Sequence, residues 1–359
     1  MRLVNLRIRH LRCLTDLSID LDPGVNVFSG GNGAGKTSVL EAVFLLSHAR
    51  SFRSGARDAL LQRGATGLSV FAELRHDDGR STKLGLGRDG SRWQARADGA
   101  TVSLGDLVRE CAVVCFEPGS HALIAGGAEE RRRFLDWGVF HVEHDFLSVW
   151  RRYQRALKQR NSLLRSANLP DETLFEPWEA ELAQTATAID AQRSHYLDAL
   201  RPSLIQHARG LLPELGEIDL RYRRGWPDEI DLANHLALSR IRDRGRGHTT
   251  AGAHRADWSI VFEQAPLREH LSRGQEKLTA LACLLAQASL YADRCGAWPI
   301  ICLDDLASEL DQAHQEAVVA QLKGASAQVL ITGTEVPEPL RARTARMFHV
   351  EQGDLTPLL

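Results

Sequence analysis

The sequence predicts an α/β protein in which a largely parallel sheet, a β-rich segment and a long inserted run of helices share 359 residues. Three observations predict this class. An apolar strand at Val25–Phe28 runs into a glycine-rich loop, a second apolar strand at Trp298–Leu303 ends in two aspartates, and helical patterning fills much of the chain between them. Short continuous apolar runs are typical of strands that are buried on both faces of a parallel sheet.

The composition is that of an ordinary soluble domain. Hydrophobic residues make up 43% of the chain and charged residues 25%. The formal net charge is −2, so any nucleic-acid surface must be a local patch. Six cysteines without a CxxC pair argue against zinc, and the first residues lack the apolar core of a signal peptide. We expect a cytoplasmic protein without a membrane association.

The elements follow in order along the chain. Alternating apolar and polar residues predict a β-rich subdomain with strands near residues 6–9, 17–21, 68–74, 82–86 and 94–97. A helix is expected over Thr37–His48, directly after the glycine-rich loop. Towards the carboxyl end, helices are expected over 278–291 and 312–322, and buried strands over 298–303 and 328–331.

From Glu129 to about Arg209, apolar residues recur every three or four positions, as on one face of a helix. Two prolines in Asn168–Pro177 interrupt this run, so we predict two antiparallel helices joined by a turn. Residues 1–127 and 250–359 would form the head, and residues 128–249 an inserted helical arm. The sequence leaves open whether the arm projects or packs on the head.

The glycine-rich loop reads GGNGAGKT and matches the phosphate-binding pattern GxxxxGK[ST] in full, between a strand and a helix. Backbone N–H groups must curl around phosphate oxygens there, which side chains would obstruct. Lys36 is expected to reach the β- and γ-phosphates of a nucleotide, and the Thr37 hydroxyl to ligate Mg²⁺. The candidate nucleotide-binding residues are Gly30, Gly31, Asn32, Gly33, Ala34, Gly35, Lys36, Thr37 and Ser38.

The strand that ends in Asp304 and Asp305 supplies the carboxylates that such a loop needs. Both acids follow an apolar strand, so they are predicted at the carboxyl edge of the buried sheet. Asp304 suits the Mg²⁺ shell, and Asp305 is the candidate catalytic residue that polarises the attacking water. Thr332, at the end of the next strand, is a candidate to stand in for the switch histidine of transporter ATPases.

Two further motifs narrow the class. The sequence LSRGQ precedes an apolar helix, and Ser272 is a good N-cap beside exposed backbone N–H groups. The segment SELD, with Ser308 and Asp311, follows the two aspartates. This order of four motifs is the pattern of ABC-type ATPases. The resemblance implies that two heads sandwich ATP as a homodimer, the nucleotide being bound in trans by Ser272, Arg273, Gly274 and Gln275.

Finer motifs resemble the RecF family of SMC-like bacterial recombination-repair proteins. Lys36 and Asp304 lie 268 residues apart, much farther than in transporter heads, and the predicted arm fills the gap. The motifs that carry the likeness are SFR at 51–53, RRRFLD at 131–136, LKQRN at 157–161, GAHR at 252–255 and DDLASELD at 304–311. Ala128 and Ala253 stand where the family usually has proline. The chain therefore resembles an ABC-ATPase head, made of a P-loop NTPase sheet with a β-subdomain, plus an inserted helical arm subdomain.

The resemblance implies a function and partners. It implies ATP and Mg²⁺ as cofactors. It also implies that the protein binds DNA at junctions or gaps and that RecR and RecO are its protein partners. ATP would close two heads on DNA and slow hydrolysis would reset them, helping to load RecA in recombinational repair and replication restart and supporting the SOS response. Two other functions remain open, an ATP sensor without significant hydrolysis and the energy subunit of a transporter.

Basic residues suggest where DNA would bind. Between Arg131 and Arg165 there are nine Arg or Lys against three acids. The candidate DNA contacts are Arg151, Arg152, Arg155, Lys158 and Arg160, and a second cluster lies at Arg240–Arg246. Such patches release counterions and bind phosphates without reading sequence. Each patch could equally be a solvated helix face or a flexible loop, and Arg131–Arg133 could instead anchor the arm.

Overall fold

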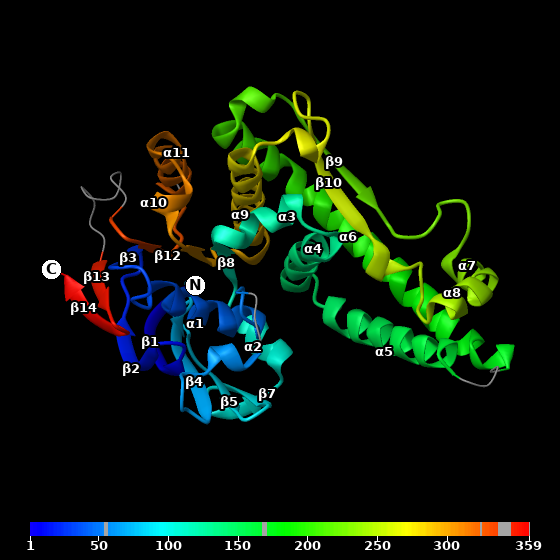
Figure 1. Cartoon of the computed structure of the whole chain (residues 1–359), viewed down its shortest axis with the longest axis horizontal. Helices are drawn as coiled ribbons and strands as arrows, with labels where there is room; N and C mark the ends of the chain where they lie inside the picture. The colour runs from blue at the N-terminus through cyan, green and yellow to red at the C-terminus, as the bar shows by residue number, and fades with distance from the viewer. Residues whose placement is uncertain (54–56, 167–170, 324, 337–345, 359) are drawn as a thin grey trace. The chain divides into compact units, whose positions relative to one another are not determined.

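The computed structural model describes residues 1–53, 57–166, 171–323, 325–336 and 346–358 (Figure 1). The chain forms two compact units. The first comprises Met1–His121, Gln206–Pro213 and Ser272–Leu359, and the second Ala122–Ile205 and Glu214–Leu271. Residues 168–170 of the predicted interhelical turn lie outside the described residues.

A six-stranded sheet carries the glycine-rich loop, in the order β14-β13-β3-β12-β11-β8. All its pairings are parallel except that of β14 with β13. The strands are β3 (Val25–Ser29), β8 (Val113–Phe116), β11 (Ile300–Leu303), β12 (Val329–Gly333), β13 (Arg346–Glu351) and β14 (Asp354–Leu358). Every residue of β8, β11 and β12 is buried, as their continuous apolar character predicts.

A second six-stranded sheet of the first unit is antiparallel throughout, in the order β2-β1-β4-β5-β6-β7. Its strands are β1 (Arg2–Leu11), β2 (Leu14–Asp20), β4 (Gly67–Arg75), β5 (Ser81–Asp89), β6 (Arg92–Ala97) and β7 (Ala100–Val102). Buried and more exposed residues alternate along β4 and β5, as expected for a sheet with one face in the core. The β-rich subdomain of the sequence prediction is this sheet.

Five helices lie wholly in the described part of the first unit, and capping residues mark both ends of the longest one, α9. They are α1 (Lys36–His48), α2 (Leu104–Glu110), α9 (Arg273–Cys295), α10 (Leu306–Glu309) and α11 (Gln312–Lys323), with short 3₁₀ turns η1 (Arg57–Leu60) and η2 (Pro118–His121). Helix α9 starts five residues before its apolar face does, because Ser272 and Gln275 form a capping box. It ends at Gly296, whose φ is +70°.

The second unit is mainly helical. It contains α3 (Ala122–Ala125), α4 (Ala128–Val142), α5 (Phe146–Leu164), most of α6 (Glu176–Leu211), α7 (Leu232–Leu238), α8 (Arg240–Arg246), the hairpin of β9 (Ile218–Arg223) with β10 (Asp257–Phe262), and the short turns η3 (Glu172–Leu174), η5 (Ala253–Arg255) and η6 (Arg268–His270). Helix α6 runs through Pro202 without ending, which a sequence reading does not predict. The cluster at 240–246 is a helix, α8, capped by Gly247.

Arg131 ties α4 to the β-hairpin of the second unit. Its Nε and Nη2 donate to the two carboxylate oxygens of Asp257 at 2.7 and 3.1 Å, and its carbonyl accepts the indole N–H of Trp258 at 2.8 Å. Because Arg131 is buried and paired in this way, it anchors the arm. This is one of the two roles that the sequence leaves open for Arg131–Arg133.

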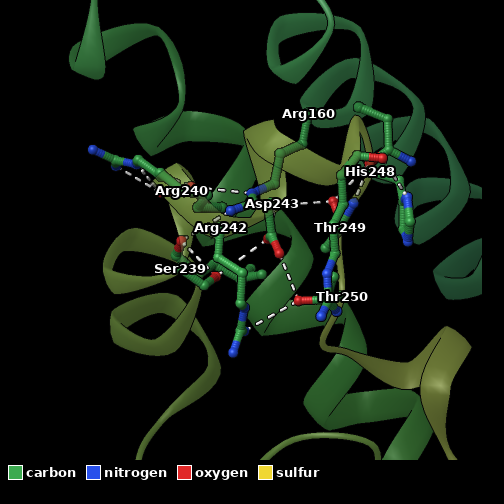
Figure 2. A network of polar contacts seen from close by, with 12 residues as sticks. Arg160, Ser239, Arg240, Arg242, Asp243, His248, Thr249 and Thr250 are labelled. Atoms are coloured by element: carbon green, nitrogen blue, oxygen red, sulfur yellow. Dashed lines mark hydrogen bonds and ion pairs between the residues drawn. The ribbon is translucent and has the colours of Figure 1, made fainter.

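Arg160 is the centre of a buried polar network in the second unit (Figure 2). Its side chain is fully buried, with an exposed fraction of 0%. Its guanidinium donates to Glu179 at 3.0 Å, to Asp243 at 2.7 Å and to the carbonyl of Leu236 at 2.9 Å. The prediction that Arg160 contacts DNA is therefore wrong, because all of the guanidinium lies inside the protein.

The same network includes two arginines of the second basic cluster, Arg240–Arg246. Arg240 donates to Glu179 at 2.6 Å, and Arg242 donates to Thr250 at 3.1 Å. Asp243 accepts a further hydrogen bond from Thr250, and Thr249 is held by Asn161 of the LKQRN segment at 2.7 Å. The network thus joins α5, α6 and α8 with the segment that follows α8.

None of the helices in the described ranges combines the length and the apolar character that crossing a bilayer would require.

Replacing Arg160 should destabilise the protein strongly. Arg160→Ala leaves the buried Asp243 carboxylate without its cation, which costs about 3–5 kcal/mol in comparable buried pairs. The matched control is Arg152→Ala on the same helix, because water can replace either partner of the exposed Arg152–Glu181 pair, so its loss should cost much less than the loss of Arg160. Urea unfolding of both variants measures the difference. Equal losses for the two would show that the network does not stabilise the arm.

Candidate functional site

The glycine-rich loop, Gly30–Gly35, joins the end of β3 to the start of α1. Gly35 caps the helix with a φ of +117°, a conformation that glycine adopts without strain. The Lys36 ammonium donates to the carbonyls of Gly30 at 2.9 Å and Gly31 at 2.8 Å, so it lies across the loop. The loop and the amino end of α1 together form an anion cradle.

The hairpin of β13 and β14 contacts this cradle and supports it. The sequence analysis does not predict this contact. The backbone N–H of Gly353 donates to the carbonyl of Ala34 at 2.8 Å. A Cβ atom on Gly30, whose φ is +154°, would lie 2.1 Å from the carbonyl oxygen of Val350. The first glycine of the loop is therefore required by contact with β13 as well as by phosphate geometry.

Asp304 lies at the carboxyl edge of the sheet and joins three segments. Its Oδ1 accepts the hydroxyl of Thr37 at 2.9 Å and that of Thr332 at 2.6 Å. Burial raises the pKa of Asp304, and the two hydroxyl donors oppose that rise. The Thr37 hydroxyl and the Asp304 carboxylate are oxygen donors of the kind that Mg²⁺ prefers, so the residues present fit the expected ion.

Asp305 adopts a left-handed conformation, with a φ of +54°. Such a conformation costs a non-glycine residue about 1–3 kcal/mol and is concentrated at functional sites. Its backbone N–H donates to the Thr332 hydroxyl at 2.9 Å, and its carboxylate accepts the hydroxyl of Ser308 at 2.9 Å. Thr332 thus contacts both aspartates, and Ser308 contacts the candidate catalytic one.

Two arginines from outside the glycine-rich loop, Arg12 and Arg53, also lie at the cradle. Arg12 and Arg53 line a pocket of about 170 Å³ together with loop residues 33–38. The fully buried Glu41 accepts two hydrogen bonds from Arg12, at 2.9 and 2.7 Å, and one from Ser51. The hydrogen bonds from Arg12 to Glu41 raise the pKa of Arg12, so the guanidinium stays protonated. The SFR segment matters here because Ser51 and Arg53 both approach Glu41.

The LSRGQ segment presents an exposed helix start. Ser272, Arg273 and Gly274 are exposed, and the Ser272 hydroxyl accepts the N–H of Gln275 at 3.3 Å. One turn on, Lys277 pairs with Glu309 of the SELD segment at 2.5 Å. Asp311 of that segment caps α11 by accepting the N–H of His314 at 2.9 Å. An ion pair therefore connects the two motifs within one head.

Three of the candidate DNA contacts form one basic face on α5. Arg151, Arg155 and Lys158 are exposed and follow the helical spacing of four and three residues. In the described part of the chain none of the three makes an ion pair. Arg152 differs, because Glu181 accepts two hydrogen bonds from its guanidinium, at 2.7 and 2.9 Å.

An anion cradle, a buried aspartate hydrogen-bonded to the cradle's threonine, a SELD turn and a capped helix start in one α/β unit define an ABC-type ATPase head. The family model described as RecF/RecN/SMC N terminal domain matches residues 2–354. With the full-length relatives below, this match shows that the chain belongs to the RecF family. The predicted family and fold class are both confirmed.

Two relatives from different bacteria show the match. "DNA replication and repair protein RecF" of Stenotrophomonas maltophilia (strain R551-3) is 48% identical, over 99% of this chain and 99% of its own length. The protein of the same name from Xanthomonas euvesicatoria pv. vesicatoria (strain 85-10) is 49% identical, over 99% of this chain and 98% of its own length.

Solved structures agree. A structure described as "recombination mediator protein RecF-ATP in RecFOR pathway" is similar with a TM-score of 0.91 at 25% identity, covering 100% of this chain and 98% of that one. An SMC head bound to the C-winged helix domain of ScpA is similar with a TM-score of 0.60 at 14% identity, covering 100% and 97%. The second likeness shows the shared head fold.

Adding one methyl group at Gly30 should disturb the cradle. Gly30→Ala places a Cβ against a backbone carbonyl, and comparable overpacking costs about 1–3 kcal/mol. Gly31→Ala is the matched control, because nothing lies within 4 Å of a Cβ there, and its effect should stay within about 0.5 kcal/mol. Urea unfolding without nucleotide compares the two. If they were equally stable, the contact with Val350 would not constrain the loop.

Proposed function

We propose that the chain is an ATP-dependent DNA-binding protein of recombinational repair, in which ATP closes two heads on DNA. One observation carries the proposal. The Asp304 carboxylate accepts hydrogen bonds from Thr37 of the cradle and from Thr332 at the end of β12. The carboxylate thereby links the cradle to the ends of β11 and β12, which supports a head that responds to nucleotide. The names of the relatives, and the RecF-ATP description of the similar structure, supply the nucleotide and the pathway.

The cradle would hold the triphosphate. Loop N–H groups and the start of α1 face the phosphates, and Lys36, Arg12 and Arg53 supply positive charge around them. Thr37 and Asp304 would hold Mg²⁺, which when bound supplies charge neutralisation at the β- and γ-phosphates. The division into an ATP-binding head and an inserted arm is part of this proposal. Its bounds follow the two compact units, so residues 122–127 and 250–271, which the sequence prediction assigns to the head, belong to the second unit, and residues 206–213 belong to the first.

A second head would complete the site. Ser272, Arg273, Gly274 and Gln275 lie at an exposed helix start, which in this proposal binds the γ-phosphate held by the partner head. Asp305, aligned through Thr332 and Ser308, would polarise the attacking water in slow hydrolysis. The Lys277–Glu309 pair would keep the LSRGQ and SELD segments of one head in a fixed relation.

DNA would meet the basic face of α5, made of Arg151, Arg155 and Lys158. Exposed cations of this kind bind phosphates through counterion release, without regard to sequence. By family resemblance the complex would act at gapped DNA with RecR and RecO, and would help load RecA.

The signature serine should control dimerisation separately from nucleotide binding. Ser272→Arg leaves the cradle intact, so ATP should still bind, but its bulk at the helix start should keep the protein monomeric. Lys36→Ala is the contrasting variant, because losing the loop ammonium should abolish both binding and dimerisation. Sedimentation with ATP and Mg²⁺, beside a nucleotide-binding assay, separates the two. A Ser272→Arg protein that still dimerised with ATP would contradict the trans arrangement.

The basic face of α5 should set the salt dependence of DNA binding. The double variant Arg151→Gln/Arg155→Gln should bind duplex DNA more weakly, and the negative slope of log K against log salt should become shallower by about 0.9 for each phosphate that the variant no longer neutralises. Arg152→Gln is the control on the same helix, because its guanidinium is already paired with Glu181. Titrations at several salt concentrations measure the slopes. The idea fails if the double variant and Arg152→Gln behave alike.

A further inference from the structure

Two large aliphatic side chains of the second unit project into solvent. Leu238, the last residue of α7, is 80% exposed, and Ile241, near the start of α8, is 90% exposed. In the described part of the chain no other large hydrophobic residue exceeds 57%. Ser239, between the two helices, keeps a right-handed helical conformation, so Leu238 and Ile241 follow the three-residue spacing of neighbours on a helix surface. Neighbouring apolar side chains on a surface mark a place where another molecule docks.

The buried network of the second unit fixes the backbone that carries these side chains (Figure 2). Asp243 of α8 is fully buried and accepts hydrogen bonds from Arg160 and Thr250. The helix ends in a regular cap at Gly247, whose φ is +70°. Because Asp243 must point inward, Ile241 cannot turn into the protein without breaking the network. The exposed apolar surface is therefore a preorganised feature of the fold.

The surface around this apolar pair is positively charged. Arg242 and Arg246 are exposed, and neither makes an ion pair with any of the described residues. The guanidinium of Arg242 donates to a threonine hydroxyl at 3.1 Å, which leaves its charge unbalanced. Among residues 232–247 the only acid is Asp243, and its carboxylate is buried. The charge of this surface therefore calls for a partner that carries acids.

This composition fits a protein partner better than it fits DNA or a second copy of the chain. Protein interfaces combine an apolar centre with arginine, which is enriched there. Phosphates would satisfy the arginines but would leave the two aliphatic side chains without apolar contacts. A two-fold contact between copies would bring like charges together, because the same surface then faces itself.

We propose that the α7–α8 corner, made of Leu238, Ile241, Arg242 and Arg246, docks an acidic amphipathic segment of another protein. Apolar side chains of that segment would cover Leu238 and Ile241, and its carboxylates would pair with the two arginines. The corner includes no residue of the nucleotide site or of the basic face of α5. It therefore adds a docking surface to the proposed function and depends on neither ATP hydrolysis nor DNA binding.

Photocrosslinking from the corner shows what covers it. The full chain carries p-benzoylphenylalanine in place of Ile241 and is irradiated in cells of its own species. The expected product is a crosslink to another protein, in a segment with apolar side chains and more Asp and Glu than Lys and Arg. The matched control carries the label in place of Leu267, which is 57% exposed in the same unit, and should not give this product. A crosslink from position 241 to DNA, to lipid, to a second copy or to no protein would overturn the inference, as would a crosslinked segment without excess acid.

A binding assay tests the two components of the corner separately. The probe is a fluorescein-labelled synthetic peptide with the sequence of the crosslinked segment, titrated by fluorescence anisotropy. Leu238→Ser/Ile241→Ser should weaken its binding at least about tenfold, as expected for the centre of an interface. Arg242→Gln/Arg246→Gln should also weaken it and make the remaining binding less sensitive to salt. Leu267→Ser is the matched control and should bind the peptide like the wild type.

The same variants exclude a structural explanation. The four substituted side chains are exposed, so both double variants should keep the urea midpoint, the ATP binding and the duplex DNA binding of the wild type. Peptide binding that is unchanged in either double variant would overturn the inference. A loss that accompanies a lower urea midpoint would overturn it too, by showing that the corner stabilises the fold. Lost duplex binding in Arg242→Gln/Arg246→Gln, with peptide binding intact, would assign the corner to DNA instead.

Discussion

The buried carboxylate of Asp304 fixes the geometry of the nucleotide-binding head. It accepts one hydroxyl from the start of α1 and another from the end of β12, while its own residue follows β11. A buried charge is tolerated only when its hydrogen bonds are made, so the three segments must keep their register for the carboxylate to be satisfied. Any shift of these strands that broke the hydrogen bonds of Asp304 would therefore also disturb the geometry of the site. The same hydrogen bonds that stabilise the sheet edge hold Thr37 and both aspartates in position.

The second unit depends on a buried cation in a comparable way. Arg160 is satisfied only when acceptors from α6, α7 and α8 meet around it, so the network selects one arrangement of these helices on α5. Arg152, eight positions earlier on α5, is half exposed and makes a similar ion pair without any such consequence. The difference lies in solvation, because water can replace Glu181 at the surface but nothing can replace Asp243 inside.

The sequence predicts best the parts of the site that short segments specify. The loop at 30–37, the strand before Asp304 and the cap at Ser272 each carry their chemistry within a few residues, and the fold class followed from their order. Counting charges was less informative, because the count treats Arg151 and Arg160 alike and only tertiary structure shows that one is exposed and the other buried. The Arg12–Glu41–Ser51 cluster and the contact of Val350 with Gly30 were missed for the same reason. They join positions that are distant in sequence, and no local pattern marks them.

The support of the cradle by the last hairpin has a consequence for synthesis on the ribosome. Gly30 emerges early, but Val350 and Gly353, which hold the loop in place, are added some 320 residues later. At about 5–20 residues per second this interval lasts tens of seconds. During that time β3 lacks both of its neighbours, β12 and β13. A nascent chain therefore cannot support its phosphate loop in this way until residues 350–353 have been added, so chain order alone delays the completion of the cradle.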